Sequence, residues 1–102
     1  MRQVRTSTTF DAQFADLLEF GERAFGEHVV ADKRRTVYRT LELLASYPAL
    51  KQPDPVHGLC AYPIRHTPFV VLYDFDDEEI RVHFIFHAHA ELSDLDPTAA
   101  VW

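Results

Sequence analysis

Two apolar runs on either side of an acidic tip constrain this chain most. The first run spans 69–73 and the second spans 80–87, and both are rich in β-branched and aromatic residues. The tip between them carries five acidic residues: Asp74, Asp76, Asp77, Glu78 and Glu79. Runs of this composition around a polar turn are typical of a β-hairpin. The stretch from Arg65 to His87 therefore predicts the centre of a sheet, on which the first half of the chain must lie.

Two helical patterns occupy that first half. Apolar residues recur at three- and four-residue spacing over 10–25 and again over 30–45, which indicates one apolar face on each helix. Gly26 is expected to stop the first helix in a left-handed conformation, and Pro48 to end the second. Because the link between them is so short, the sequence predicts an antiparallel helical hairpin whose apolar faces need a sheet to cover.

Short strands are expected at 2–6 and 59–65, and Pro63 places the second of them at a sheet edge. Thr8 is the expected N-cap of the first helix, with Asp11 answering it in a capping box. The predicted order is strand, helix, helix, strand, strand, strand. This is an α+β fold in which a mostly antiparallel sheet carries the helical hairpin on one face.

Composition limits the classes of function. The chain has 102 residues, 47% of them hydrophobic, which fits a single domain over 1–102 with a modest core. Its 10 basic and 16 acidic residues give a net charge of −6, which disfavours general nucleic-acid binding and makes a basic protein partner easier to accommodate. Cys60 is the only cysteine, so an intramolecular disulfide is impossible. We expect a soluble cytoplasmic protein, because no apolar run approaches the length of a membrane span or follows the basic start as in a signal peptide.

Histidines and a basic cluster are the first candidates for chemistry. His83 and His87 are expected on one strand face, about 13 Å apart, which is too far to hold one metal ion. His87 and His89 are closer, but no Cys or Glu accompanies them at ligand spacing, so neither a metal site nor a cofactor is expected. The basic run 33–35 with Arg39 is interpreted as a solvated helix face or as a contact surface for an acidic partner or nucleic acid.

Motifs for covalent or phosphate chemistry do not occur in the sequence. It has no glycine-rich phosphate loop, no Gly-x-Ser-x-Gly and no His-Glu-x-x-His. Cys60 lies in an apolar strand, where a small core residue is expected rather than a nucleophile. The acidic tip is interpreted as a hairpin end. Composition and spacing alone therefore indicate a small soluble α+β domain and no specific reaction.

The ordered set of elements resembles the RelE/ParE superfamily of toxins from bacterial type II toxin–antitoxin systems. The resemblance covers nearly the whole chain and rests on these features in order: an opening strand before a Thr-capped helix, a helical hairpin with Leu41-x-x-Leu44 ending at Pro48, Arg65 before a turn, the runs 69–73 and 80–82, a strand ending at His87, and the tail 92–97. It implies a compact sheet with a helical hairpin on one face. It also implies a cognate antitoxin that folds a helix or strand across the toxin to form a hetero-oligomer.

The resemblance implies one of two activities. RelE-like members cleave mRNA on the ribosome, which requires cationic groups and an acid–base group around the hairpin. ParE-like members poison DNA gyrase without a catalytic centre of their own. Arg65 matches a basic position of the ribonucleases, but Val70 and Ala88 stand where arginines commonly occur. These departures favour a ParE-like, non-enzymatic toxin that poisons gyrase and is neutralised by an antitoxin.

Two alternatives stay open. One is a RelE-like ribonuclease acting on mRNA at the ribosome, with Arg65 and His87 as candidate catalytic residues. The other is a degenerate relative that only binds an antitoxin. In every case the polar groups expected to contact the target or the antitoxin are Arg65, Arg81, His83 and His87.

Overall fold

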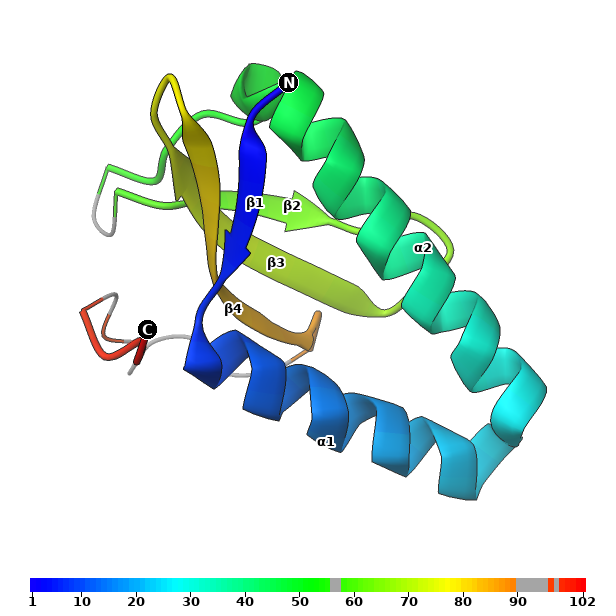
Figure 1. Ribbon diagram of the computed structural model, residues 1–102. Coiled ribbons are helices and arrows are strands. Elements are labelled where there is room, and N and C mark those ends of the chain that lie inside the picture. The colour runs from blue at the N-terminus through cyan, green and yellow to red at the C-terminus, as the bar shows by residue number, and fades with distance from the viewer. Residues whose placement is uncertain (56–57, 90–95, 97) are drawn as a thin grey trace.

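A computed structural model describes residues 1–55, 58–89, 96 and 98–102 (Figure 1). Its elements follow in the order β1 (Gln3–Thr6), α1 (Thr8–Phe25), α2 (Glu27–Ser46), a 3-10 helix η1 (Pro48–Leu50), β2 (Cys60–Pro63), β3 (Phe69–Phe75) and β4 (Glu79–His87). The four strands form one sheet in the order β1-β4-β3-β2. β1 runs parallel to β4, and the other two pairs are antiparallel. The predicted α+β fold and its element order are confirmed.

The two helices pack on one face of the sheet and diverge from their junction at Gly26 (Figure 1). Gly26 has φ 92°, a left-handed conformation that ends α1 and starts α2 without a further linker residue. Gly21 lets the helices approach each other here, since a Cβ at this position would lie 3.3 Å from Val30 Cγ2. Both ends predicted for the helices, at Gly26 and before Pro48, are confirmed.

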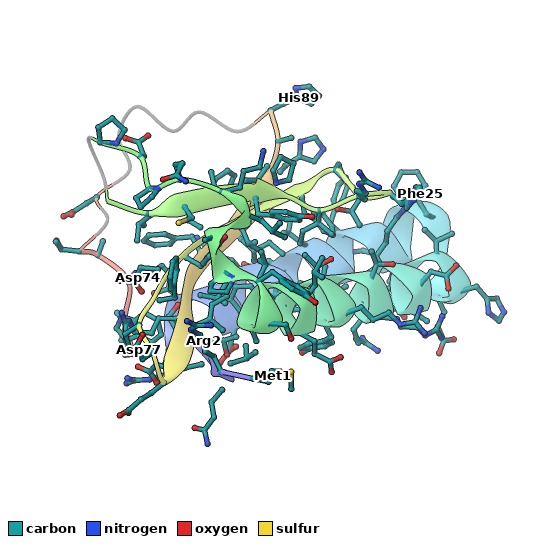
Figure 2. All side chains as sticks on the ribbon, turned by 90° about the horizontal axis from the view of Figure 1, so that it is seen from above. Met1, Arg2, Phe25, Asp74, Asp77 and His89 are labelled. Carbon is teal, nitrogen blue, oxygen red and sulfur yellow. The ribbon has the colours of Figure 1, made fainter. Side chains whose placement is uncertain are left out.

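The helices and the sheet form two separate layers in Figure 2, and the core lies between them. Fully buried members come from both layers and include Phe10, Val37, Leu41 and Leu44 from the helices, and Val71, Tyr73, Ile80, Val82 and Ile85 from the strands. The Tyr73 hydroxyl donates a hydrogen bond to the Pro48 carbonyl at 2.7 Å, so this phenol is buried without leaving its polar group unpaired. The apolar stripes predicted for the helices thus supply most of the helical side of the core, but Phe25 and Tyr38 of these stripes remain exposed, which corrects the prediction at those two positions.

The N-cap of α1 differs from the sequence prediction by one residue. Ser7, not Thr8, has the extended N-cap conformation, and its Oγ accepts a hydrogen bond from the Phe10 amide at 2.8 Å. Asp11 instead accepts a hydrogen bond from the Thr6 hydroxyl at 2.9 Å. Ser7 is fully buried and its hydroxyl also donates to the His83 carbonyl on β4 at 2.6 Å, so packing onto the sheet selects the cap.

The sheet edges are formed by short strands. β2 is an edge strand and contains Pro63, as predicted, although it spans Cys60–Pro63 rather than the expected 59–65. β1 forms the opposite edge, where it pairs with β4 alone. A proline at an edge removes no hydrogen bond from the sheet interior, which explains its position.

A β-bulge at His83 changes the direction of the side chains along β4. The register passes from Leu72 opposite Phe84 to Tyr73 opposite Val82, so His83 is the extra residue on β4. Val82 packs in the core under the helices, whereas Phe84 belongs to a second cluster, with Leu59 and Leu72, on the other face. The expectation that His83 and His87 share one face is therefore wrong, because the bulge interrupts the two-residue alternation between them.

The C-terminal segment returns to the start of α1. Val101 and Thr9 are joined by two hydrogen bonds, from the Val101 amide to Thr9 Oγ1 (2.8 Å) and from the Thr9 amide to the Val101 carbonyl (3.2 Å). Val101 and Trp102 both lie against the fold here. In the tail 92–97, which contributes to the family resemblance, Leu92 and Leu95 fall outside the described residues.

Candidate functional site

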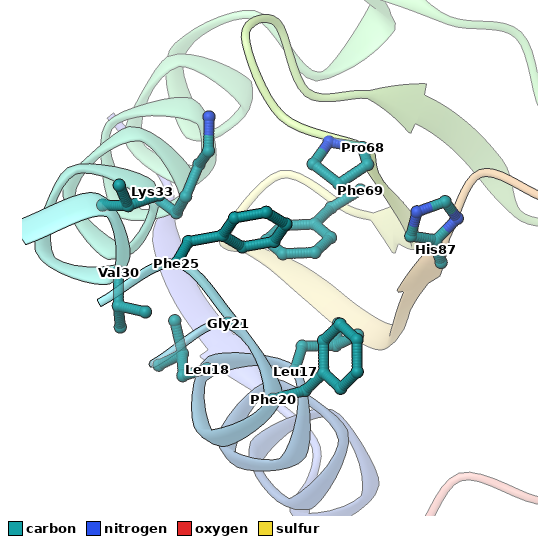
Figure 3. A pocket seen from close by; sticks show the side chains of 11 residues that line it. Leu17, Leu18, Phe20, Gly21, Phe25, Val30, Lys33, Pro68, Phe69 and His87 are labelled. Carbon is teal, nitrogen blue, oxygen red and sulfur yellow. The ribbon is translucent and has the colours of Figure 1, made fainter. Parts of the chain in front are cut away.

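An apolar groove opens between the helical hairpin and one end of the sheet (Figure 3). It has a volume of about 230 Å³ and is lined by side chains from both helices and from the ends of β3 and β4: Leu17, Leu18, Phe20, Gly21, Phe25, Val29, Val30, Lys33, Pro68, Phe69 and His87. Phe20 and Phe25 are 66% and 68% exposed. Large aromatic side chains left open to solvent in one contiguous patch are typical of a protein-binding surface.

Two polar side chains border this groove, Lys33 and His87. Lys33 reaches across it and donates a hydrogen bond from Nζ to the His66 carbonyl at 2.5 Å. His66 has φ 64°, the left-handed conformation of a tight turn. His87 accepts a hydrogen bond at Nδ1 from the His89 amide at 3.2 Å. The groove is thus apolar at its centre and carries hydrogen-bonding groups at its border.

Arg65 and His87, the candidate catalytic residues, lie at the same end of the sheet. Arg65 is exposed in the turn between β2 and β3, and it forms no side-chain hydrogen bond or ion pair in the described part of the chain. His87 pairs with Phe69, and the next amide, Ala88, bonds to the Pro68 carbonyl at 2.7 Å. The turn that bears Arg65 therefore adjoins the strand that ends at His87.

Arg81 and His83 lie elsewhere, on the sheet face away from the helices and toward the acidic hairpin tip. Figure 2 shows Asp74 and Asp77 of this tip at the opposite end of the molecule from Phe25 of the groove. The four predicted contact residues thus fall into two separate pairs. The bulge at His83 and the length of β4 keep those pairs apart, and sequence spacing did not show this.

Arg81 is held by three carboxylates. Its Nε donates to Asp74 at 2.8 Å, and its Nη1 donates to Asp76 at 2.7 Å and to Glu79 at 3.2 Å. The hydrogen bond from Arg81 and two backbone amides lower the pKa of Asp76 to about 2, and the same carboxylates raise the pKa of Arg81. Carboxylates outnumber the arginine in this hydrogen-bonded network, and three of the five N–H donors of Arg81 are already engaged within the hairpin tip.

The His83 side chain is enclosed by groups from β3 and from the C-terminus. Its Nε2 lies 3.2 Å from Asp74 Oδ1, and its ring meets the Trp102 ring edge-on at 4.8 Å. Trp102 in turn lies under the Arg5 guanidinium at 5.0 Å from the ring centroid. The His83 side chain is only 13% exposed, and its buried Nδ1 has no hydrogen-bond partner among the described groups. Contact with a large partner at His83 would require Trp102 to move first.

A metal site and a cysteine nucleophile each have structural requirements with which the described residues can be compared. Within them, no group of three or more His, Cys, Asp or Glu side chains is placed to hold a metal ion. The His87 and His89 rings lie 5.3 Å apart, and no third ligand accompanies them among the residues that the structure describes. Cys60 is buried, and this burial raises the pKa of its thiol, which disfavours the nucleophilic thiolate. Among the described helices, none is long and apolar enough to cross a membrane.

The groove was not predicted from the sequence, although Phe25 and several other lining residues of the helices lie within the apolar patterns over 10–25 and 30–45. Phe20 lies off its stripe, and a large aromatic residue off the core face near Gly26 was the available signal. The exposure of Phe25 had no such signal, because it depends on how far the two helices diverge from the sheet.

Comparison with known proteins agrees with the fold. The family model described as the ParE toxin of type II toxin–antitoxin system, parDE, matches residues 4–91. A search of curated proteins finds no match. The chromosomal ParDE toxin–antitoxin system from P. aeruginosa contains a chain similar in fold, with a TM-score of 0.74 and 13% identity over 85% of this chain and 96% of that one. Since the family match spans most of the sequence, the chain belongs to the ParE toxins of type II toxin–antitoxin systems.

Proposed function

We propose that this ParE toxin stops growth by poisoning DNA gyrase in the cytoplasm, and that a cognate antitoxin neutralises it by occupying the apolar groove. Membership of a toxin–antitoxin system implies an antitoxin partner. The groove is a suitable contact site for the antitoxin, because it exposes Phe20 and Phe25 to a partner and is lined by side chains of both helices. An amphipathic helix laid into such a groove would bury its apolar face there.

The charge arrangement at the end of the sheet favours gyrase over RNA as the target. Cleavage of a phosphodiester needs cations around the scissile group. Arg65 is near the strand end of His87, but Val70 pairs with Phe86 and supplies no charge, and Ala88 follows His87. Arg81 is already engaged by three carboxylates. A mechanism that needs only protein–protein contact fits this surface better than acid–base catalysis.

Two assays on the purified toxin test the proposal. We expect inhibited supercoiling by gyrase, reversed by the antitoxin encoded next to the toxin gene, and no cleavage of mRNA on purified ribosomes. Cleavage of ribosome-bound mRNA that is lost in Arg65→Ala would contradict the proposal and establish the ribonuclease alternative. Antitoxin binding without growth arrest or gyrase inhibition would identify a degenerate relative instead.

A further inference from the structure

The outward side of α2 carries a second surface, distinct from the groove. This surface, which we call the arginine surface, consists of four exposed residues: Arg34, Arg35, Tyr38 and Arg39. They line a shallow hollow of about 490 Å³ together with Ala31 and Glu42. The neighbouring Lys33 does not belong to it, because its side chain lines the groove on the other side of the helix.

Two of the three guanidinium groups are available to a partner. Arg35 donates to Asp32 at 3.0 Å, one helical turn away. In the described part of the chain, Arg34 and Arg39 form no side-chain hydrogen bond and no ion pair. Each guanidinium has five N–H donors in a planar fork that matches a carboxylate in a bidentate manner. The fold thus presents two cations without internal carboxylates to satisfy them.

Tyr38 gives this surface a fixed aromatic centre. Its ring meets Phe14 of α1 edge-on, with centroids 5.7 Å apart and an interplanar angle of 78°. It nevertheless remains 51% exposed, although it falls within the apolar pattern over 30–45. An aromatic ring held in place before binding costs little entropy on association, and Tyr and Arg are enriched among residues that dominate binding energy.

The charge pattern favours a protein partner over a nucleic acid. The chain carries a net charge of −6, and carboxylates of Asp32 and Glu42 border the arginines. A phosphate backbone is a dense row of negative charges whose binding requires a basic surplus, and this chain lacks one. A carboxylate-rich protein surface needs only the local cations, and it would also bury Tyr38. Charge complementarity therefore selects an acidic protein segment.

We propose that the arginine surface docks a carboxylate-rich segment of the protein that the toxin attacks. This inference rests on the proposed toxin function and assigns it a contact surface. The groove and the arginine surface lie on different sides of α2, so the two contacts involve different residues. Substitutions on the arginine surface are thus expected to separate toxicity from antitoxin binding.

The test uses Arg34→Glu and Arg39→Glu in the full chain, because neither removes an internal contact. Arg23→Glu on α1 is the matched control, since it makes the same charge change at an exposed site whose side chain, among the described residues, pairs only with Glu19. Growth arrest on induction and inhibition of gyrase supercoiling are the two readouts. We expect each surface variant to need about tenfold or more toxin for the same inhibition, and the control to change less than about twofold.

Folding and antitoxin binding are measured on the same proteins, and both should match the wild type within error. If the surface variants arrest growth as strongly as the wild type at equal protein level, the inference is overturned and the proposed function stays intact. Arrest that depends on Arg34 and Arg39 without gyrase inhibition would support the surface and overturn gyrase as target. No arrest by the wild type would overturn both. Binding of a short labelled DNA duplex that is lost in both variants would overturn the choice of a protein partner.

Discussion

Ser7 and His83 are joined by a hydrogen bond from the serine hydroxyl to the histidine carbonyl at 2.6 Å, across 76 positions of sequence. The same hydroxyl accepts the Phe10 amide at the start of α1. One buried atom therefore caps the first helix and ties it to β4 at the bulge. Ser7 fixes where the helical layer begins relative to the sheet, and with it the wall of the groove formed by α1.

Replacing Ser7 with alanine removes both hydrogen bonds and leaves a buried carbonyl and amide without a partner. We expect Ser7→Ala to lower the free energy of unfolding by about 2 kcal/mol, from a lost cap and a lost buried hydrogen bond. Urea denaturation followed by circular dichroism measures this change. Thr8→Ala is the matched control at the exposed neighbouring residue, and a larger loss there than at Ser7 would contradict the assigned cap.

The groove predicts a large effect on binding from an exposed residue. Phe20→Ala removes an aromatic side chain that is 66% exposed, so stability should change by no more than about 0.5 kcal/mol. Affinity for the antitoxin should fall about tenfold or more, as for a central aromatic contact, when measured by calorimetry. Tyr47→Ala is the control, because Tyr47 is 62% exposed but does not line the groove. Equal effects of the two substitutions on affinity would rule out the groove as the antitoxin site.

Asp76 makes the stability of the toxin change with pH in the acidic range. Its pKa is lowered from 3.8 to about 2, chiefly by the hydrogen bond from Arg81. A lowered pKa in the folded state means that the ionised carboxylate stabilises the fold above pH 3.8 and that this contribution disappears as the pH falls to about 2. The wild type should therefore lose its advantage over Asp76→Asn between these values in acid denaturation curves. A constant difference across this range would show that Asp76 is not paired in solution.

Tyr73 tests the connection between the core and the loop after α2. Tyr73→Phe keeps the packing but leaves the Pro48 carbonyl without the hydrogen bond now formed at 2.7 Å. We expect the free energy of unfolding to fall by about 1 kcal/mol, since only one hydrogen bond is lost from a buried site. Thermal unfolding by calorimetry measures it. Tyr62→Phe is the control at a half-buried tyrosine of β2, and an equal loss there would mean that the Pro48 contact adds nothing.

The sequence by itself determined the elements of this protein and their order. Gly26 and Pro48 end the helices through their own backbone preferences, and the two apolar runs around the acidic tip form β3 and β4. Pro63 correctly indicated a sheet edge. These signals are local, because each depends on the allowed dihedral angles or on the side-chain period of a few neighbouring residues. The resemblance to the toxin family used the same ordered elements and is confirmed by the family match.

Only the tertiary structure decided which functional groups meet. The bulge put His83 and His87 on opposite faces, and Ser7 rather than Thr8 became the cap because it alone reaches the carbonyl of His83. The groove and its exposed Phe25 arise from the way two helices diverge over a sheet. Strand register and helix placement minimise the energy of contacts between distant segments, so no short window of sequence contains them.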